Sequence, residues 1–378
     1  MASYNYTIVH IWGIPIRINI SLIIFLPILA WLIGSGEQIA AYSVLITELT
    51  PATVDPAALS EPTDRWLIGI ITAVGLFASV TFHELGHSWV AMRYDIEVES
   101  ITLWLLGGLA SLKNMPDQWE QEFWIAIAGP ASSLVLAAGC TWTLYFVPET
   151  ATLLVYTLGF LAIMNIVLAV FNMLPAFPMD GGRILRSLLA RNRSYVSATR
   201  TAARIGVAFA FGFALLGVLV FSPLMLLLAL FIYVAATSES RSVVISELLS
   251  GETVADLIGD QKPLPADIPV GQAFERLFAA RRTELPVVDE NGDIIGVVTA
   301  SQLKQVPPEA YRTTTVREIT TTDLLHLDGN ASAAEGLYEL LGSREGVAIV
   351  EWEGRQIGLI SRADFTAALD IRREVGPF

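Results

Sequence analysis

Five stretches without Asp, Glu, Lys or Arg constrain this 378-residue chain more than any other feature. These stretches are residues 18–36, 66–82, 123–148, 150–179 and 205–238. A membrane-spanning helix needs about 20 mostly apolar residues, and the last stretch can hold two, separated at Ser222-Pro223. The sequence therefore predicts a polytopic α-helical membrane protein with about six spans, near residues 19–35, 66–90, 123–147, 151–175, 204–221 and 223–238.

The distribution of charge divides the chain near residue 240. Residues 241–378 hold 22 acidic and 13 basic side chains and no apolar stretch long enough to span a membrane. We therefore expect a transmembrane domain over residues 1–240 and a soluble domain over residues 241–378. Arginine crowds the loop after the fourth span, whereas residues 37–64 carry acids and neither Lys nor Arg. Because basic loops mark the cytoplasmic side, both termini and the soluble domain are predicted to be cytoplasmic.

Composition excludes several other classes. The net charge of -14 argues against a nucleic-acid partner. Cys140 is the only cysteine, so an intrachain disulfide is impossible. Only three of the 23 basic residues are lysine, and such an acidic, lysine-poor chain suggests a halophilic prokaryote. The expected location is thus a cell membrane, with the lipid bilayer as the main surrounding medium.

Two segments beside the predicted spans favour short β-strands. Residues 6–20 (YTIVHIWGIPIRINI) contain two β-branched runs around Gly13 and Pro15, which is typical of a hairpin. Residues 98–112 have a similar character and a break at Gly107-Gly108. The sequence leaves two interpretations open: ordinary surface strands, or a small sheet whose free edge pairs with an extended substrate.

The motif HELGH at residues 83–87 fits the pattern H-E-x-x-H. Helix positions i and i+4 share a face, so both imidazoles can reach one metal ion. Two interfacial histidines with ordinary hydrogen bonds are the alternative, but polar groups at membrane depth are costly and usually functional. Glu84 is placed to act on a water molecule rather than to bind the metal. Asn165, in the fourth span, is expected to form a hydrogen bond between helices.

A catalytic zinc site takes three protein ligands and keeps one position open. The best candidate for the third ligand is Asp180, which ends a long apolar stretch. Two prolines break the helix just before it, and Gly181-Gly182 allows close approach of the backbone. A helix-ending aspartate at the interface or a salt bridge to Arg183 is the alternative. We predict that His83, His87 and Asp180 bind one Zn²⁺.

These motifs together resemble the site-2 protease family, zinc metalloproteases that cut peptide bonds within or near the membrane. The resemblance covers about residues 1–240, and it implies that Asp180 is the third zinc ligand. It also implies that Asn172 helps to orient the substrate or the transition state. Gly129-Pro130 resembles the G-P helix start of the family, although Ser132-Ser133 stands where many members have Asn. The implied substrate is a membrane-anchored protein with a transmembrane segment.

The soluble domain contains an internal repeat. Residues 285–303 align without gaps to residues 347–365. Each copy has a β-rich run, a turn at a glycine, a second run and a helix start, and Asn291-Gly292 is a strong hairpin signal. Two copies of one unit imply a pseudo-symmetric pair that buries a shared face.

This repeat resembles a tandem CBS-domain pair of α/β type. The resemblance implies an adenine nucleotide (ATP, ADP or AMP) near Thr299, Ser361 and Asp364, although Gln302 replaces the Asp expected in the first copy. A purely structural module that forms a homodimer is the alternative. Asp364 at a helix N-terminus needs no ligand to explain it.

Peptide hydrolysis needs an activated water molecule, and Glu84 is the predicted catalytic residue. The resulting prediction is a site-2-type metalloendopeptidase, modulated by nucleotide binding to the CBS pair. A CBS-gated membrane transporter or channel is the main alternative, and a zinc-binding scaffold without activity is the third. Transport does not require a glutamate beside two metal ligands, and the intact Glu84 argues against the scaffold.

Overall fold

The computed structural model describes residues 5–105, 107–113, 116, 118–259 and 261–375. The chain forms two compact units, Met1–Arg241 and Ser242–Phe378. Each unit has its own clusters of buried apolar side chains.

The first unit is built mainly from helices. They are α1 (Ile20–Ile33), α2 (Gly36–Leu49), η1 (Pro56–Leu59), α3 (Pro62–Arg93), α4 (Trp119–Leu144), α5 (Thr152–Asn172), α6 (Asp180–Ala190), α7 (Tyr195–Leu219) and α8 (Pro223–Leu248). Among the described residues, α3, α4, α5, α7 and α8 are each long and apolar enough to cross a membrane. The bent pair of α1 and α2 gives a sixth span if it is counted as one. The predicted helical membrane fold is therefore confirmed.

The span predicted near residues 19–35 corresponds to α1, and α2 extends beyond its predicted end. α1 and α2 meet at an angle of 71°, because Gly34 ends α1 and Ser35 starts α2 by accepting a hydrogen bond from Gln38 N at 3.4 Å. α1 packs tightly on α3, and a Cβ at Gly69 would collide with the carbonyl oxygen of Ala30. Small residues of this kind let membrane helices approach closely.

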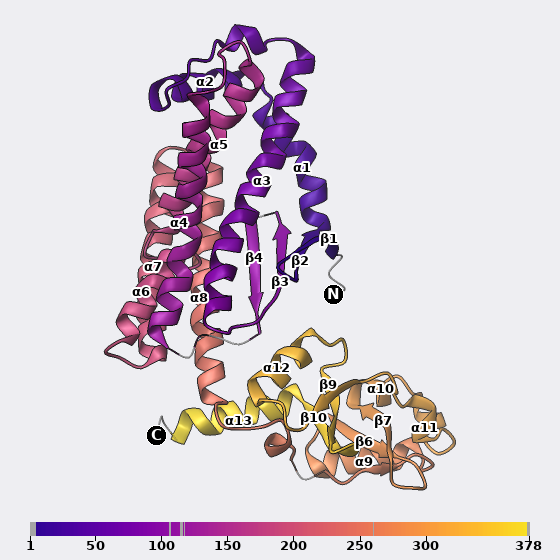
Figure 1. The fold of residues 1–378 in the computed structure, drawn as a ribbon. Coiled ribbons are helices and arrows are strands. Elements are labelled where there is room, and N and C mark those ends of the chain that lie inside the picture. Colours follow the sequence, from indigo (N-terminus) through magenta and orange to yellow (C-terminus); the bar gives the residue numbers. More distant parts are fainter. Residues whose placement is uncertain (1–4, 106, 114–115, 117, 260, 376–378) are drawn as a thin grey trace. The chain divides into compact units, whose positions relative to one another are not determined.

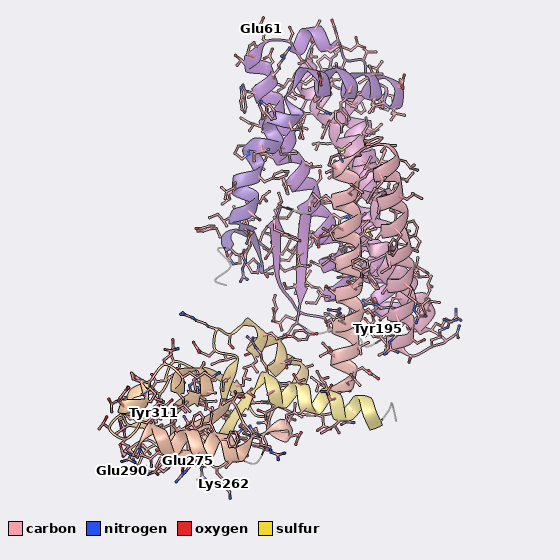
Figure 2. The ribbon with its side chains drawn as sticks, turned by 180° about the vertical axis from the view of Figure 1, so that it is seen from behind. Glu61, Tyr195, Lys262, Glu275, Glu290 and Tyr311 are labelled. Atoms are coloured by element: carbon pink, nitrogen blue, oxygen red, sulfur yellow. The ribbon has the colours of Figure 1, made fainter. Side chains whose placement is uncertain are left out.

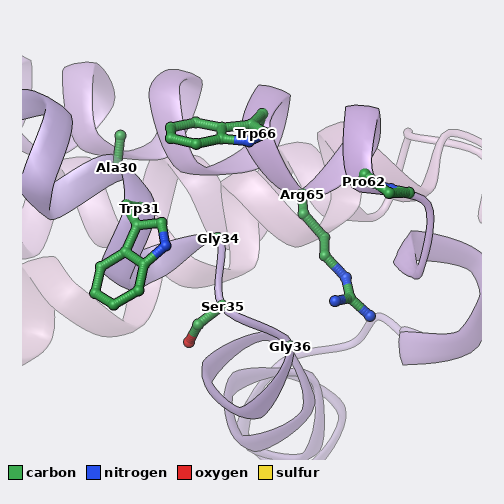
Figure 3. Close-up of a pocket in the computed structure, with 8 residues that line it drawn as sticks. All are labelled: Ala30, Trp31, Gly34, Ser35, Gly36, Pro62, Arg65 and Trp66. Carbon is green, nitrogen blue, oxygen red and sulfur yellow. The ribbon is translucent and has the colours of Figure 1, made fainter.

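A cavity of about 210 Å³ lies at this bend and is lined by Trp31, Ser35, Arg65 and Trp66 among others (Figure 3). Tryptophan and arginine at helix ends are typical of the membrane–water interface. His83 follows Arg65 by 18 residues on the same helix, a separation of roughly 27 Å at 1.5 Å per residue. The cavity is therefore separate from the histidine pair.

Four strands form one sheet beside the second half of α3 (Figure 1). They are β1 (Asn5–Ile11), β2 (Ile14–Asn19), β3 (Val98–Trp104) and β4 (Gly107–Leu112), in the order β1-β2-β3-β4. β1 and β2 form the predicted antiparallel hairpin, β2 pairs parallel with β3, and β3 pairs antiparallel with β4. Ile14, Ile16 and Ile101 of the sheet pack with Ala91 of α3 and Ile125 of α4. The sheet is thus fixed to the two helices, with β4 at one edge.

A hydrogen bond joins two of the long helices, and two charged segments mark the ends of the first unit. Asn165 Nδ2 of α5 donates to Ser79 Oγ of α3 at 3.0 Å, which confirms the predicted hydrogen bond between helices. Glu61, before α3, and Tyr195, at the start of α7, lie at opposite ends of the unit (Figure 2). The acidic segment that precedes α3 and the arginine-rich loop near the start of α7 therefore lie at opposite ends of the first unit.

The second unit contains two three-stranded sheets with the orders β5-β6-β7 and β10-β9-β8. The strands are β5 (Leu264–Pro265), β6 (Glu284–Val288), β7 (Ile294–Thr299), β8 (Leu325–Asp328), β9 (Val347–Trp352) and β10 (Arg355–Ser361). The helices are η2 (Ala255–Leu257), α9 (Val270–Ala280), α10 (Ala300–Leu303), η3 (Pro308–Ala310), α11 (Val316–Ile319), α12 (Ala333–Gly342) and α13 (Arg362–Val375).

The two halves of this unit repeat the same pattern. The β6–β7 and β9–β10 hairpins turn at Gly292 and Gly354, whose φ angles of 88° and 76° favour glycine. Val297 and Leu324 pack with Val347, Ile349 and Leu359 in one shared core. The predicted internal repeat and its shared buried face are therefore confirmed.

Candidate metal centre

Three side chains from α3 and α6 bring their donor atoms to one point. His83 Nε2 lies 3.1 Å from Asp180 Oδ2, His87 Nε2 lies 3.2 Å from the same oxygen, and the two Nε2 atoms are 3.2 Å apart. All three residues are buried, with exposed fractions of 4%, 6% and 7%. The cluster is the predicted ligand set, although the three residues span 97 positions of sequence.

The two imidazoles are oriented from their other nitrogen. His87 Nδ1 donates to the carbonyl oxygen of Ile125 at 2.6 Å, and His83 Nδ1 lies 2.9 Å from Ser133 Oγ. A ring whose Nδ1 carries the proton presents a lone pair at Nε2. When both Nε2 atoms carry lone pairs, these and the carboxylate oxygen repel one another at the observed distances unless a cation lies between them. The hydrogen bonds therefore prepare the site for a metal ion.

Glycine in α4 leaves room for such an ion. A Cβ built on Gly129 would stand 2.7 Å from His83 Nε2 and would also collide with His87 Nε2. It would therefore occupy the space that the two nitrogens face. Two histidines and one carboxylate are a usual donor set for catalytic zinc, and tetrahedral donors at about 2.1 Å from zinc lie roughly 3.4 Å apart. The separations of 3.1–3.2 Å fit this group.

Asp180 reaches the histidines because α6 begins on a tight loop. The chain turns at Pro175 and Pro178 after α5, and the peptide bond before Pro178 is cis. A Cβ on Gly181 would stand 2.5 Å from Met173 O, and one on Gly182 would stand 2.6 Å from Phe177 N. The two glycines thus let the first turn of α6 lie directly on the loop, as expected from the sequence. Asp180 contacts the two histidines, and no ion pair between Asp180 and Arg183 is found among the described residues.

Glu84 lies half-buried beneath strand β4. A Cβ on Gly108 would stand 2.5 Å from Glu84 Cγ and 2.9 Å from its Oε1. The backbone of β4 therefore passes directly over this carboxyl group. Asn172, at the end of α5, donates from Nδ2 to Leu168 O at 3.0 Å, and no contact between it and the three donors is found among the described residues.

The candidate nucleotide residues occupy equivalent places in the two copies of the second unit. Thr299 starts α10 in a capping box with Gln302, while the backbone N–H and the hydroxyl of Ser361 donate to Asp364 Oδ2 at 3.0 and 2.9 Å. Asp364 Oδ1 pairs at 3.2 Å with Arg282 of the first copy. Both oxygens of Asp364 are therefore engaged within the chain.

The sequence predicted no role at the metal centre for four residues that contribute to it. Ile125, Gly129 and Ser133 lie four residues apart on one face of α4 and meet the imidazoles, and Gly108 meets Glu84. The four-residue spacing on α4 was a signal for a shared face, but nothing in the sequence linked that face to the histidines. From the sequence, the Gly107-Gly108 pair predicts only a break between strands.

Known proteins identify the family. The chain matches the model "Peptidase family M50" over residues 71–153 and 149–213 and the model "CBS domain" over residues 255–308. Rip3 of Mycobacterium tuberculosis is 32% identical over 388 residues, which cover 97% of this chain and 93% of Rip3. Zinc metalloprotease MJ0392 of Methanocaldococcus jannaschii is 30% identical over 378 residues, covering 98% and 97% of the two chains. The solved site-2 protease from the same archaeon is 35% identical with a TM-score of 0.42, and covers 63% of this chain and 96% of that one.

Rip3 and MJ0392 match nearly the whole chain, so the match includes both units. The predicted resemblances to site-2 proteases and to CBS domains are confirmed, and the matches favour a protease over a CBS-gated transporter or channel. The chain therefore belongs to peptidase family M50, the site-2 proteases, and is a zinc-dependent metalloendopeptidase with a CBS domain in its second unit.

Proposed function

We propose that His83, His87 and Asp180 hold the catalytic zinc and that Glu84 is the general base for hydrolysis of peptide bonds within or near transmembrane segments. One observation carries this proposal. Three buried acceptor atoms converge at 3.1–3.2 Å from one another, with the glutamate next to the first of them in sequence. We assign this activity to residues 1–240 and regulation to residues 241–378.

Zinc held by these donors would supply Lewis acidity, which activates water and polarises the scissile carbonyl. Glu84 accepts a proton from the attacking water and returns it to the leaving nitrogen, a contribution of roughly 10²–10⁴ in rate. Burial of the three donors keeps bulk solvent away, which strengthens the electrostatic interactions inside the site. Asn172 is proposed, by its position in the family motif, to orient the substrate.

A single-span membrane protein is the proposed substrate. Peptide bonds in a transmembrane helix are hydrogen-bonded internally, so the helix must unwind before it can be cut. β4 is the edge strand beside Glu84, and an unwound segment can pair with its free backbone groups. Proline or charge substitutions along residues 104–112 should therefore reduce cleavage of a substrate without reducing the zinc content.

The proposed topology places both termini and the second unit in the cytoplasm. The arginine-rich loop at the α7 end of the first unit supports this orientation, because basic loops stay on the cytoplasmic side. The acidic segment before α3 lies at the opposite end, as expected for the external face. A fusion reporter at each terminus tests this assignment.

We further propose that the CBS pair binds an adenine nucleotide near Thr299, Ser361 and Asp364, that binding opens the Asp364–Arg282 pair, and that the bound nucleotide regulates the protease. The 3.2 Å pair between the two copies supports this, since a ligand that contacts Asp364 competes with Arg282. Dimer formation through the same unit belongs to this proposal. Light scattering of the full chain with and without ATP or AMP measures whether the nucleotide changes the fraction of dimer.

The decisive experiment measures zinc per chain by elemental analysis of the detergent-purified protein. We expect about one zinc in the wild type and clear loss in Asp180→Asn. Glu84→Gln should keep its zinc but fail to cut a doubly tagged single-span protein. Full zinc in Asp180→Asn would reject the ligand set. Folded wild-type protein without zinc would return a CBS-gated transporter to first place.

A further inference from the structure

A buried arginine joins three helices next to the metal centre. Arg186 of α6 is 4% exposed. Its Nε donates to Glu122 Oε1 of α4 at 2.7 Å, its Nη2 pairs with the same oxygen, and its Nη1 donates to Glu239 Oε1 of α8 at 2.6 Å. A buried ion pair adds little net stability compared with apolar packing. The cluster therefore calls for a role in position rather than in stability alone.

The same guanidinium also holds the loop that leads to Asp180. Its central carbon lies 4.9 Å from the ring centre of Phe177 and 4.9 Å from that of Tyr195. Phe177 is 2% exposed, precedes Asp180 by three residues, and is touched by the first turn of α6 at Gly182. The loop before Asp180, the first turn of α6 and the side chain of Arg186 therefore pack against one another.

The ion pair connects the two halves of the donor set. α4 carries Ile125 and Ser133, which orient the imidazoles, and Glu122 lies in the first turn of that helix. α6 carries Asp180 at its first position. Any change in the separation of α4 and α6 therefore changes the separation of the imidazoles from the carboxylate.

We propose that Arg186 is a positioning residue for the metal site, which holds Asp180 at its distance from His83 and His87 by fixing α6 to Glu122 of α4. Glu239 is the more exposed partner of Arg186, since its side chain is 31% exposed. This inference rests on the metal site proposed above. Among the described residues, Arg186 forms no hydrogen bond or ion pair with the three donor atoms or with Glu84.

The test is competition for zinc in the full-length, zinc-loaded protein in detergent. Each variant is dialysed against rising concentrations of a chelator, and the zinc that remains is measured by elemental analysis. Loss of a residue behind a metal ligand usually weakens metal binding roughly 10- to 100-fold. We expect Arg186→Gln to lose its zinc at a chelator concentration roughly tenfold lower than the wild type does. Arg186→Lys and Glu239→Gln should also lose zinc at a lower chelator concentration, but with a smaller difference from the wild type.

Arg183→Gln is the matched control, because it removes one positive charge from the same helix, whereas Arg183 forms no ion pair among the described residues and acts on Glu122 only through its charge at longer range. It should follow the wild-type curve. The thermal unfolding of each zinc-free variant shows whether it is folded. A folded Arg186→Gln with the wild-type chelator curve overturns the proposal. If Arg186→Gln does not fold, wild-type curves for both Arg186→Lys and Glu239→Gln overturn it.

Failure of the underlying metal site gives a different result. In that case the wild type holds no zinc, or Asp180→Asn holds as much as the wild type. Loss of zinc from Asp180→Asn together with an unchanged curve in the Arg186 variants would reject only the positioning role.

Discussion

Replacement of Gly129 by alanine should remove the metal site while leaving the fold intact. The added Cβ would stand 2.7 Å from His83 Nε2, whereas ordinary contacts begin near 3.4 Å. Either the imidazole or α4 must therefore move by at least about 0.7 Å, and metal–ligand distances tolerate only about 0.2 Å. If α4 moves, the hydrogen bonds of the imidazoles with Ile125 O and Ser133 Oγ, now 2.6 and 2.9 Å, lengthen as well. Beyond about 3.5 Å such a contact no longer orients the ring.

The effect on stability should be small by comparison. Overpacking typically costs about 1–3 kcal/mol, and alanine in place of glycine inside a helix offsets about 1 kcal/mol of this. The free energy of unfolding of zinc-free Gly129→Ala should therefore fall by no more than about 2 kcal/mol.

Gly139→Ala is the matched control for this experiment. Gly139 lies in the same helix, and nothing stands within 4 Å of its added Cβ. Elemental analysis of the detergent-purified proteins should find about one zinc per chain in the wild type and in Gly139→Ala, and almost none in Gly129→Ala. About one zinc in a folded Gly129→Ala would refute the conclusion that this glycine borders the metal position.

Three further predictions concern other parts of the chain. Gly108→Ala should displace Glu84, because the new Cβ would stand 2.9 Å from Glu84 Oε1. Cleavage of a tagged single-span substrate should then fall roughly tenfold or more, while the zinc content stays unchanged. Unchanged cleavage would contradict the role given to β4. Asn165→Leu removes the 3.0 Å hydrogen bond to Ser79 and should lower the free energy of unfolding in detergent by about 0.6 kcal/mol without loss of zinc; loss of zinc would show that this bond also supports the site. Hydrogen bonds from the backbone and hydroxyl of Thr315 hold the pKa of Glu318 below its usual value of 4.5. The stability that Glu318 adds is therefore present at a pH above its unfolded pKa, and it is lost as the pH falls through the lower pKa of the folded state. Unfolding of Glu318→Gln and wild type should therefore differ near neutral pH and converge in acid, and a difference independent of pH would reject this explanation.

Local patterns in the sequence predicted most of the elements. Long uncharged stretches predicted the spanning helices because the bilayer imposes length and apolarity on each helix separately. The repeat between residues 285–303 and 347–365 predicted the paired sheets for a similar reason, since each copy has its own turn and strand signals. The bend between α1 and α2 was not predicted, because the uncharged stretch continues through Gly34 and Ser35.

The sequence by itself determined that His83 and His87 share a helix face and that Asp180 follows a broken helix. Only the tertiary structure decided what surrounds them. The face of α4 with Ile125, Gly129 and Ser133 meets the imidazoles, and Arg186 reaches Glu122 across 64 residues of sequence. Helical periodicity reports which residues of one helix face the same way, but it does not report which other helix that face will meet. That choice depends on how all the helices pack together, and the packing sets the 3.1–3.2 Å separations at the metal centre.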